Sequence, residues 1–213
     1  MKNKNSHSKL KSNINNKFKR FKQHKLYLSF VIIIILSFIF GLLFLALLST
    51  ENKEMIKESL DQFFLLVGSN DLNYFSALLN SLRNSVGVNL LIWILGISII
   101  GIPIILLISL FKSFTLGFTL SSIVYFYGIR GGVIGIIYIL PGLVILFIYL
   151  ITSVVAISFS RHLFNMIIRR KEVVFKTISR RYVKLLGLST AALILCSLIE
   201  IYLIPFILRT IIA

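Results

Sequence analysis

The chain has 213 residues, of which 57% are hydrophobic and only 14% are charged. An ordinary soluble domain has about one quarter charged residues, so this composition excludes a water-soluble protein. The net charge of +16 does not indicate a nucleic-acid partner, because the 23 basic residues gather at the ends of apolar runs, where they orient a membrane protein and meet anionic lipid. Cys196 is the only cysteine, so neither an intramolecular disulfide nor a cysteine metal cluster is expected.

The first two segments are a basic tail and an apolar run. Residues 1–25 hold nine Lys or Arg and no acid. Such a segment has too few apolar groups to offset the entropy of ordering, so we predict a disordered cytoplasmic tail. Residues 26–48 follow as 23 uncharged residues, long enough to cross a bilayer at about 1.5 Å per helical residue.

Residues 49–87 form a long connector that carries five of the seven acids of the chain. Apolar residues at helical spacing between Ile56 and Val67 lie opposite Glu54, Glu58 and Asp61, which indicates an amphipathic helix. A second periodic stretch, from Phe75 to Val86, leads into the next span. We expect a helical hairpin on the outer membrane surface, a docking surface for an extracytoplasmic partner, or both. The candidate docking residues are Glu54, Glu58, Asp61, Phe63 and Phe64.

Four further apolar stretches predict the remaining spans, at about 88–111, 113–128, 132–160 and 185–208. Short loops rich in Lys and Arg stay in the cytoplasm, so Lys112 and the basic loop 161–184 are both expected inside. Residues 113–160 must then leave the cytoplasm and return, which makes the short stretch a true span. The sequence therefore predicts an all-α, polytopic integral membrane protein, with one bundle over residues 26–208, five transmembrane helices and a cytoplasmic N-terminus.

Glycine and proline concentrate in spans two to four, where they predict close packing and broken or kinked helices. Gly128 with Gly132, and Gly131 with Gly135, have the four-residue spacing that lets two helices approach closely. We expect kinks at the prolines and a helix break near Pro141. Broken helices can line a substrate path, but close packing without transport is the preferred interpretation. The packing and kink residues are Gly96, Gly101, Pro103, Gly117, Gly128, Gly131, Gly132, Gly135, Pro141, Gly142 and Pro205.

Glu200 is the one acid inside an apolar run. A carboxylate in hydrocarbon costs at least about 2.5 kcal/mol, so it must be paired, protonated or face a cavity. The predicted topology puts Arg130, Tyr125 and Tyr138 at a similar depth, which makes them its candidate partners. Glu200 is either a structural anchor between helices or a proton or ion site. We prefer the anchor, because a transport site normally has more than one polar group at depth.

Two stretches of the sequence resemble the central signature of the stage II sporulation protein M family. They are Trp93-Ile-Leu-Gly-Ile-Ser-Ile-Ile-Gly-Ile-Pro103 and Phe111-Lys-Ser-Phe-Thr-Leu-Gly-Phe-Thr119. The short Gly128 to Gly135 turn, Leu140-Pro141 and the ending Glu200-Ile-Tyr-Leu-Ile-Pro205 are similar to the later helices of that family. The resemblance covers residues from about 26 to 208 and leaves out the basic tail.

The resemblance implies a membrane protein of endospore-forming bacteria, located at the sporulation septum on the mother-cell side and needed when the mother cell engulfs the forespore. It implies no active site and no cofactor. The protein would be a scaffold that assembles two membrane-anchored peptidoglycan hydrolases, stage II sporulation proteins D and P. The alternative function is a small transporter or channel component that uses Glu200.

Overall fold

The computed structural model describes residues 28–68, 73–98, 100–169 and 175–207. All regular elements within these ranges are helical, and five helices are long and apolar enough to cross a membrane. The prediction of an all-α, polytopic membrane protein with five spans is therefore confirmed. The predicted basic tail, residues 1–25, lies outside the described residues.

Six helical segments follow one another along the chain. The first helix, Leu28–Leu47, ends in a 3-10 turn, and α2 covers Thr50–Gly68. The second span is α3, Tyr74–Gly96. The long element α4, Gly101–Arg169, is a hairpin that contains the third span, Gly101–Ile129, and the fourth, Gly131–Phe164; we call these its first and second arms. The fifth span, Ser179–Ile207, comprises most of α5, Phe175–Leu198, and the π-helical turn η2, Ile199–Leu203.

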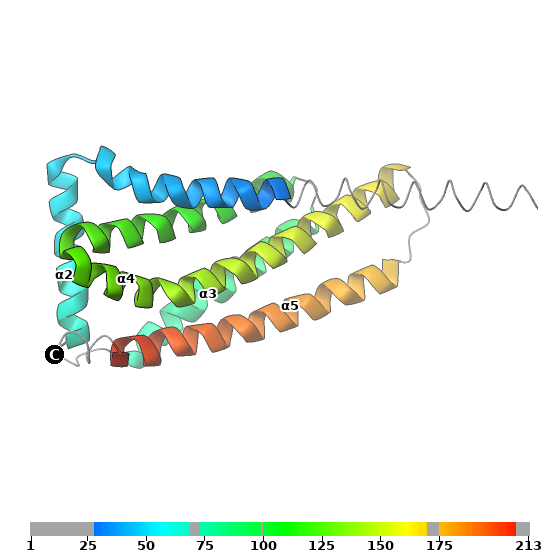
Figure 1. The fold of residues 1–213 in the computed structure, drawn as a ribbon. Coiled ribbons are helices and arrows are strands. Elements are labelled where there is room, and N and C mark those ends of the chain that lie inside the picture. Colours follow the sequence, from blue (N-terminus) through cyan, green and yellow to red (C-terminus); the bar gives the residue numbers. More distant parts are fainter. Residues whose placement is uncertain (1–27, 69–72, 99, 170–174, 208–213) are drawn as a thin grey trace, which may run out of the picture.

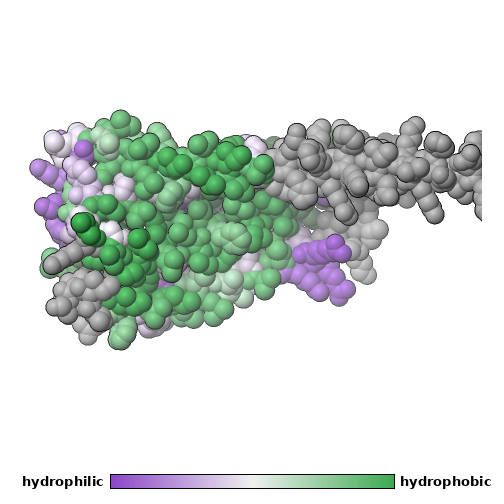
Figure 2. Space-filling model, viewed as in Figure 1, coloured by the Kyte–Doolittle hydropathy of each residue, from purple (hydrophilic) through white to green (hydrophobic). Residues whose placement is uncertain are grey.

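Figure 1 shows the spans side by side, with α2 lying across one end of the bundle at a steep angle to them. We call this end the α2 end. Hydrophobic residues cover most of the face of the bundle seen in Figure 2, while hydrophilic residues gather at the α2 end and at the opposite end. This distribution is the one expected for a bundle surrounded by lipid, because uncompensated polar groups are costly within the hydrocarbon layer.

The turn between spans two and three lies at residues 97–100 and not at Lys112, so the predicted spans 88–111 and 113–128 have the wrong boundaries. Gly96 ends α3, and Gly101 begins α4 so close to the preceding turn that a Cβ atom there would collide with the Leu95 carbonyl. Pro103 occupies the first turn of α4, where proline costs no helix hydrogen bond. Lys112 consequently lies in the middle of an unbroken helix.

The outer connector was also predicted with the wrong boundaries. The predicted second helix of the surface hairpin, from Phe75 to Val86, is the first half of span α3, which begins at Tyr74. The basic loop 161–184 is also shorter than predicted, because α4 continues to Arg169 and α5 begins at Phe175. Only α2 therefore lies across the end of the bundle.

The break in α4 lies at Gly128 and not near Pro141. Gly128 has φ 60° and ψ −141°, the one non-helical conformation within α4, whereas Pro141 lies inside continuous helix. A positive φ is readily adopted only by glycine, so this residue makes the sharp reversal between the two arms possible. The proposed close-approach pair Gly128 and Gly132 is also wrong, since no atom lies within 4 Å of a Cβ placed at either residue.

Other predicted glycines do mark close approaches. A Cβ atom at Gly117 would collide with the Phe38 carbonyl oxygen. One at Gly41, which was not among the predicted residues, would collide with the Phe114 carbonyl oxygen. The first helix and the first arm of α4 thus touch backbone to backbone. Added Cβ atoms would also meet neighbouring atoms at four more of the predicted positions, namely Gly96, Gly131, Gly135 and Gly142.

Candidate functional site

A polar cavity of about 520 Å³ lies among α3, both arms of α4 and η2. Ten of the fifteen residues that line it are polar, an unusual lining for the interior of a membrane bundle. The polar residues are Asn80, Ser81, Asn84 and Ser85 on α3, Lys112, Thr115 and Thr119 on the first arm of α4, Tyr138 and Tyr149 on the second arm, and Glu200 on η2.

Glu200 reaches the cavity from the π-helical turn η2. Pro205 accounts for this turn, because it has no N–H to donate and its ring would clash with the carbonyl of residue 201 in a regular α-helix. The Ser81 hydroxyl donates a hydrogen bond of 3.0 Å to Oε2 of Glu200. The carboxylate is therefore held between α5 and α3, as an anchor between helices would be. π-Helical turns are often found at functional sites.

Lys112 brings a positive charge to the same cavity. Its Nζ donates a hydrogen bond of 2.8 Å to Oδ1 of Asn84. Asn84 is three residues after Ser81, so the two side chains lie on the same turn of α3. This turn therefore binds both Lys112 and Glu200. Within the described part of the chain, Lys112 and Glu200 each bind a neutral side chain and form no ion pair with each other.

Two tyrosines complete the lining of the polar cavity. The Tyr149 hydroxyl donates a hydrogen bond of 2.9 Å to the Ser85 carbonyl, which fixes the second arm of α4 against α3. Tyr138 lines the cavity together with Glu200, and its ring also meets Phe63 of α2 edge to face at 5.5 Å between ring centroids. The structure thus brings Tyr138 to the cavity of Glu200, as expected from its depth.

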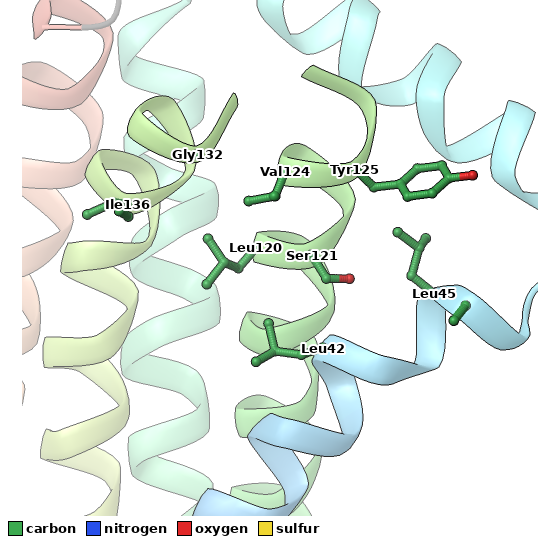
Figure 3. Close-up of a pocket in the computed structure, with 9 residues that line it drawn as sticks. Leu42, Leu45, Leu120, Ser121, Val124, Tyr125, Gly132 and Ile136 are labelled. Atoms are coloured by element: carbon green, nitrogen blue, oxygen red, sulfur yellow. The ribbon is translucent and has the colours of Figure 1, made fainter. Parts of the chain in front are cut away.

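Tyr125, the second predicted partner of Glu200, lines a different cavity. This apolar cavity of about 500 Å³ lies between the first helix and the α4 hairpin, and Figure 3 shows the Tyr125 ring pointing away from Gly132. Lys53 of α2 places its Nζ 5.5 Å from the centroid of that ring. The prediction that Tyr125 pairs with Glu200 is therefore wrong, and the side chain of Arg130 lies outside the described residues.

The predicted docking residues of α2 divide into two faces. Phe63 and Phe64 pack against the bundle, where the Phe64 ring meets Tyr127 edge to face at 5.0 Å between centroids. Asp61 accepts a hydrogen bond of 2.5 Å from the Tyr127 hydroxyl. These three residues attach α2 to the bundle and are not free for a partner. Glu54 and Glu58 are exposed on the other face.

Sequence reasoning missed most of the cavity. Ser81 and Asn84 were assigned to the outer connector and Lys112 to a turn, and only Glu200, Tyr138 and Gly142 were selected from within spans. The signal that could have found them is their spacing, because Asn80, Ser81 and Asn84 recur at three and four residues, on one face of a helix.

Comparison with known proteins gives one family. The family model described as Stage II sporulation protein M matches residues 30–205, which is most of the chain and all five spans apart from the ends of the first and last. No curated protein and no solved structure matches the chain.

Proposed function

Because the chain belongs to the stage II sporulation protein M family, we propose that this sporulation-related membrane protein is a non-enzymatic scaffold for forespore engulfment. In this proposal it lies at the septum on the mother-cell side. There it gathers the membrane-anchored hydrolases, stage II sporulation proteins D and P, which cut the peptidoglycan.

The observation that carries the proposal is the attachment of α2 across the end of the bundle. Its inner face is held by the aromatic contacts of Phe63 and Phe64 and by the hydrogen bond from Tyr127 to Asp61. Its other face presents Glu51, Glu54 and Glu58 to solvent, together with Leu65, which is 71% exposed. A fixed helix with exposed acids and an exposed leucine can bind a partner at little entropic cost, because it is already ordered.

The proposal is tested by neutralising the exposed acids in sporulating cells. Glu51, Glu54 and Glu58 are replaced together by Gln, and the position of fluorescently tagged hydrolases is recorded by microscopy. We expect the hydrolases to spread along the membrane and engulfment to stall, as in a strain that lacks the protein. Lys57→Gln is the control, because it changes an exposed charge of the same helix. Normal septal localisation of the hydrolases at normal protein abundance would show that α2 does not recruit them.

A second candidate function is supported by the polar cavity, which reaches Glu200 at membrane depth. Transport of protons or small polar solutes would use such a cavity, and Glu200 would then have to change its protonation or its contacts. Glu200→Gln distinguishes the two functions, because Gln can still accept a hydrogen bond from Ser81. If the protein is a scaffold, a strain with this variant engulfs normally. If it is a transporter, the same strain fails although the variant is abundant.

A further inference from the structure

The outward face of the first half of α3 is polar, although α3 is a membrane span. Five residues form a stripe at positions i, i+4, i+7, i+8 and i+11, and all five are exposed. They are Ser76, Asn80, Arg83, Asn84 and Gly87, and we call them the α3 stripe. In agreement with this stripe, α3 is the least apolar of the five spans. Asn80 and Asn84 also line the polar cavity, so the stripe borders its opening.

The stripe begins at Ser76, near the start of α3, and its other residues lie further along the span. Arg83 is nine residues after the start of α3, which is about 14 Å at the rise of an α-helix, and Lys112 is about 16 Å from the start of α4. Both residues are therefore near the middle of a hydrocarbon layer of about 30 Å. Polar groups exposed to lipid at this depth are costly and are normally covered by protein. Another helix packed on the α3 stripe would remove this cost.

The charges around the stripe indicate what covers it. Arg83 is exposed on the stripe, and Lys112 lies beside it, bound to Asn84. Glu200, the acid of the cavity, is bound to Ser81. The opening therefore has an excess of positive charge at a depth where charges attract strongly. A carboxylate on the covering helix would compensate it.

A second copy of the chain does not supply that carboxylate. Only Glu200, among the seven acids of the sequence, lies in a span, and it is already bound within its own cavity. Two α3 stripes placed face to face would also bring Arg83 close to its own copy, which is unfavourable between like charges. The charge pattern therefore favours a different protein.

We propose that the α3 stripe binds a transmembrane helix of another membrane protein, which carries an Asp or Glu near its middle. Its carboxylate binds Arg83 and Lys112 at the opening of the polar cavity. At Gly87 no atom lies within 4 Å of where a Cβ would be, so this position lets the partner backbone approach closely. The cost of polar groups at depth, and not the proposed scaffold function, supports this binding site.

The test uses synthetic transmembrane peptides as probes. The full chain is reconstituted in phosphatidylcholine vesicles, with a donor fluorophore on Lys57→Cys in a Cys196→Ser background. Acceptor-labelled Leu-rich peptides of about 23 residues carry a single central Glu, Lys or Leu. We expect energy transfer to report about tenfold tighter association of the Glu peptide than of the other two.

Two variants decide whether this preference arises at the stripe. Arg83→Gln should bring the Glu peptide close to the level of the Leu peptide, whereas Arg83→Lys should keep much of the preference. Arg180→Gln is the matched control, because it removes an exposed arginine near the start of α5, at the end of the bundle opposite the α2 end. Circular dichroism checks that each variant is folded.

Three results would overturn the proposal. The first is equal association of the three peptides, or a preference for the Glu peptide that Arg83→Gln leaves intact. The second is self-association of the labelled chain that Arg83→Gln abolishes, which would make the stripe a contact between copies. The third is a preference for the Glu peptide that disappears when anionic phosphatidylglycerol is added, which would identify a lipid as the preferred ligand of the cations.

Discussion

Ser81 of α3 donates a hydrogen bond of 3.0 Å to the carboxylate of Glu200, a residue 119 positions later in the chain. The bond joins the second span to the π-helical turn of the fifth and closes one side of the polar cavity. It is a long-range polar contact between two membrane spans.

Removing the Ser81 hydroxyl should destabilise the bundle. In Ser81→Ala the Glu200 carboxylate loses its donor, and we expect a loss of about 1 to 3 kcal/mol in the free energy of unfolding. Unfolding by denaturing detergent in mixed micelles measures the loss. Ser76→Ala is the control, because Ser76 is exposed and its side chain does not line the cavity. Equal stability of the two variants would show that the hydrogen bond has no net effect.

The contact between the first helix and α4 should not tolerate a methyl group. In Gly117→Ala the new Cβ would collide with the Phe38 carbonyl oxygen, so the two helices must separate. We expect a cost of about 1 to 3 kcal/mol, the usual range for overpacking. Gly132→Ala should be neutral or slightly stabilising in the same unfolding assay, since nothing lies near its Cβ position. A neutral Gly117→Ala would contradict the close approach.

The reversal within α4 should require glycine at position 128. Gly128→Ala forces a side chain into the φ 60°, ψ −141° conformation, which should cost about 1 to 3 kcal/mol. Gly187→Ala, in a helical and open position of α5, is the matched control. Hydrogen exchange should show faster opening at both ends of the α4 turn in the first variant only. Unchanged exchange in Gly128→Ala would mean that the turn adapts without strain.

Attachment of α2 should depend on the hydrogen bond between Tyr127 and Asp61. Tyr127→Phe removes the donor and keeps the ring that packs against Phe64. We expect a loss of about 1 kcal/mol, because the bond is only partly buried and solvent screens it. Faster hydrogen exchange across α2, with unchanged exchange in α5, would be the measured effect. Tyr202→Phe is a control on a tyrosine that does not contact α2 through a hydrogen bond. Identical exchange in both variants would mean that the aromatic contacts alone hold α2.

The number of spans could be predicted from the sequence, whereas the boundaries of two of them could not. Each span contains a long apolar run, and the count follows from these runs. The first half of α3 contains Asn80, Ser81, Arg83 and Asn84. It was assigned to the outer connector, as the second helix of a surface hairpin, because its apolar residues recur at helical spacing. In the structure these four polar residues face a cavity or form the exposed α3 stripe. Lys112 was assigned to a cytoplasmic turn, because short loops that carry Lys or Arg stay inside.

The polar cavity was harder to predict than the fold. Depth along a span follows from residue count, which is why Tyr138 was correctly placed near Glu200. The direction in which a side chain points does not follow, because the first arm of α4 is apolar on most sides and its sequence does not indicate which face meets which neighbour. Tyr125 was therefore placed at a suitable depth but on the wrong side. Ser81 was not considered as a partner of Glu200, because the predicted second span began only at residue 88.

Tyr138 belongs to two surfaces at once, since it lines the polar cavity and its ring edge contacts Phe63 of α2. A ligand that displaces α2 must therefore change the shape of one wall of the cavity. A ligand that fills the cavity must change the surface against which α2 packs. Any resulting change in affinity is reciprocal, because linkage gives the same coupling free energy in both directions. In such a protein, a ligand bound in the cavity between the spans can change the affinity of the surface helix α2 for a partner.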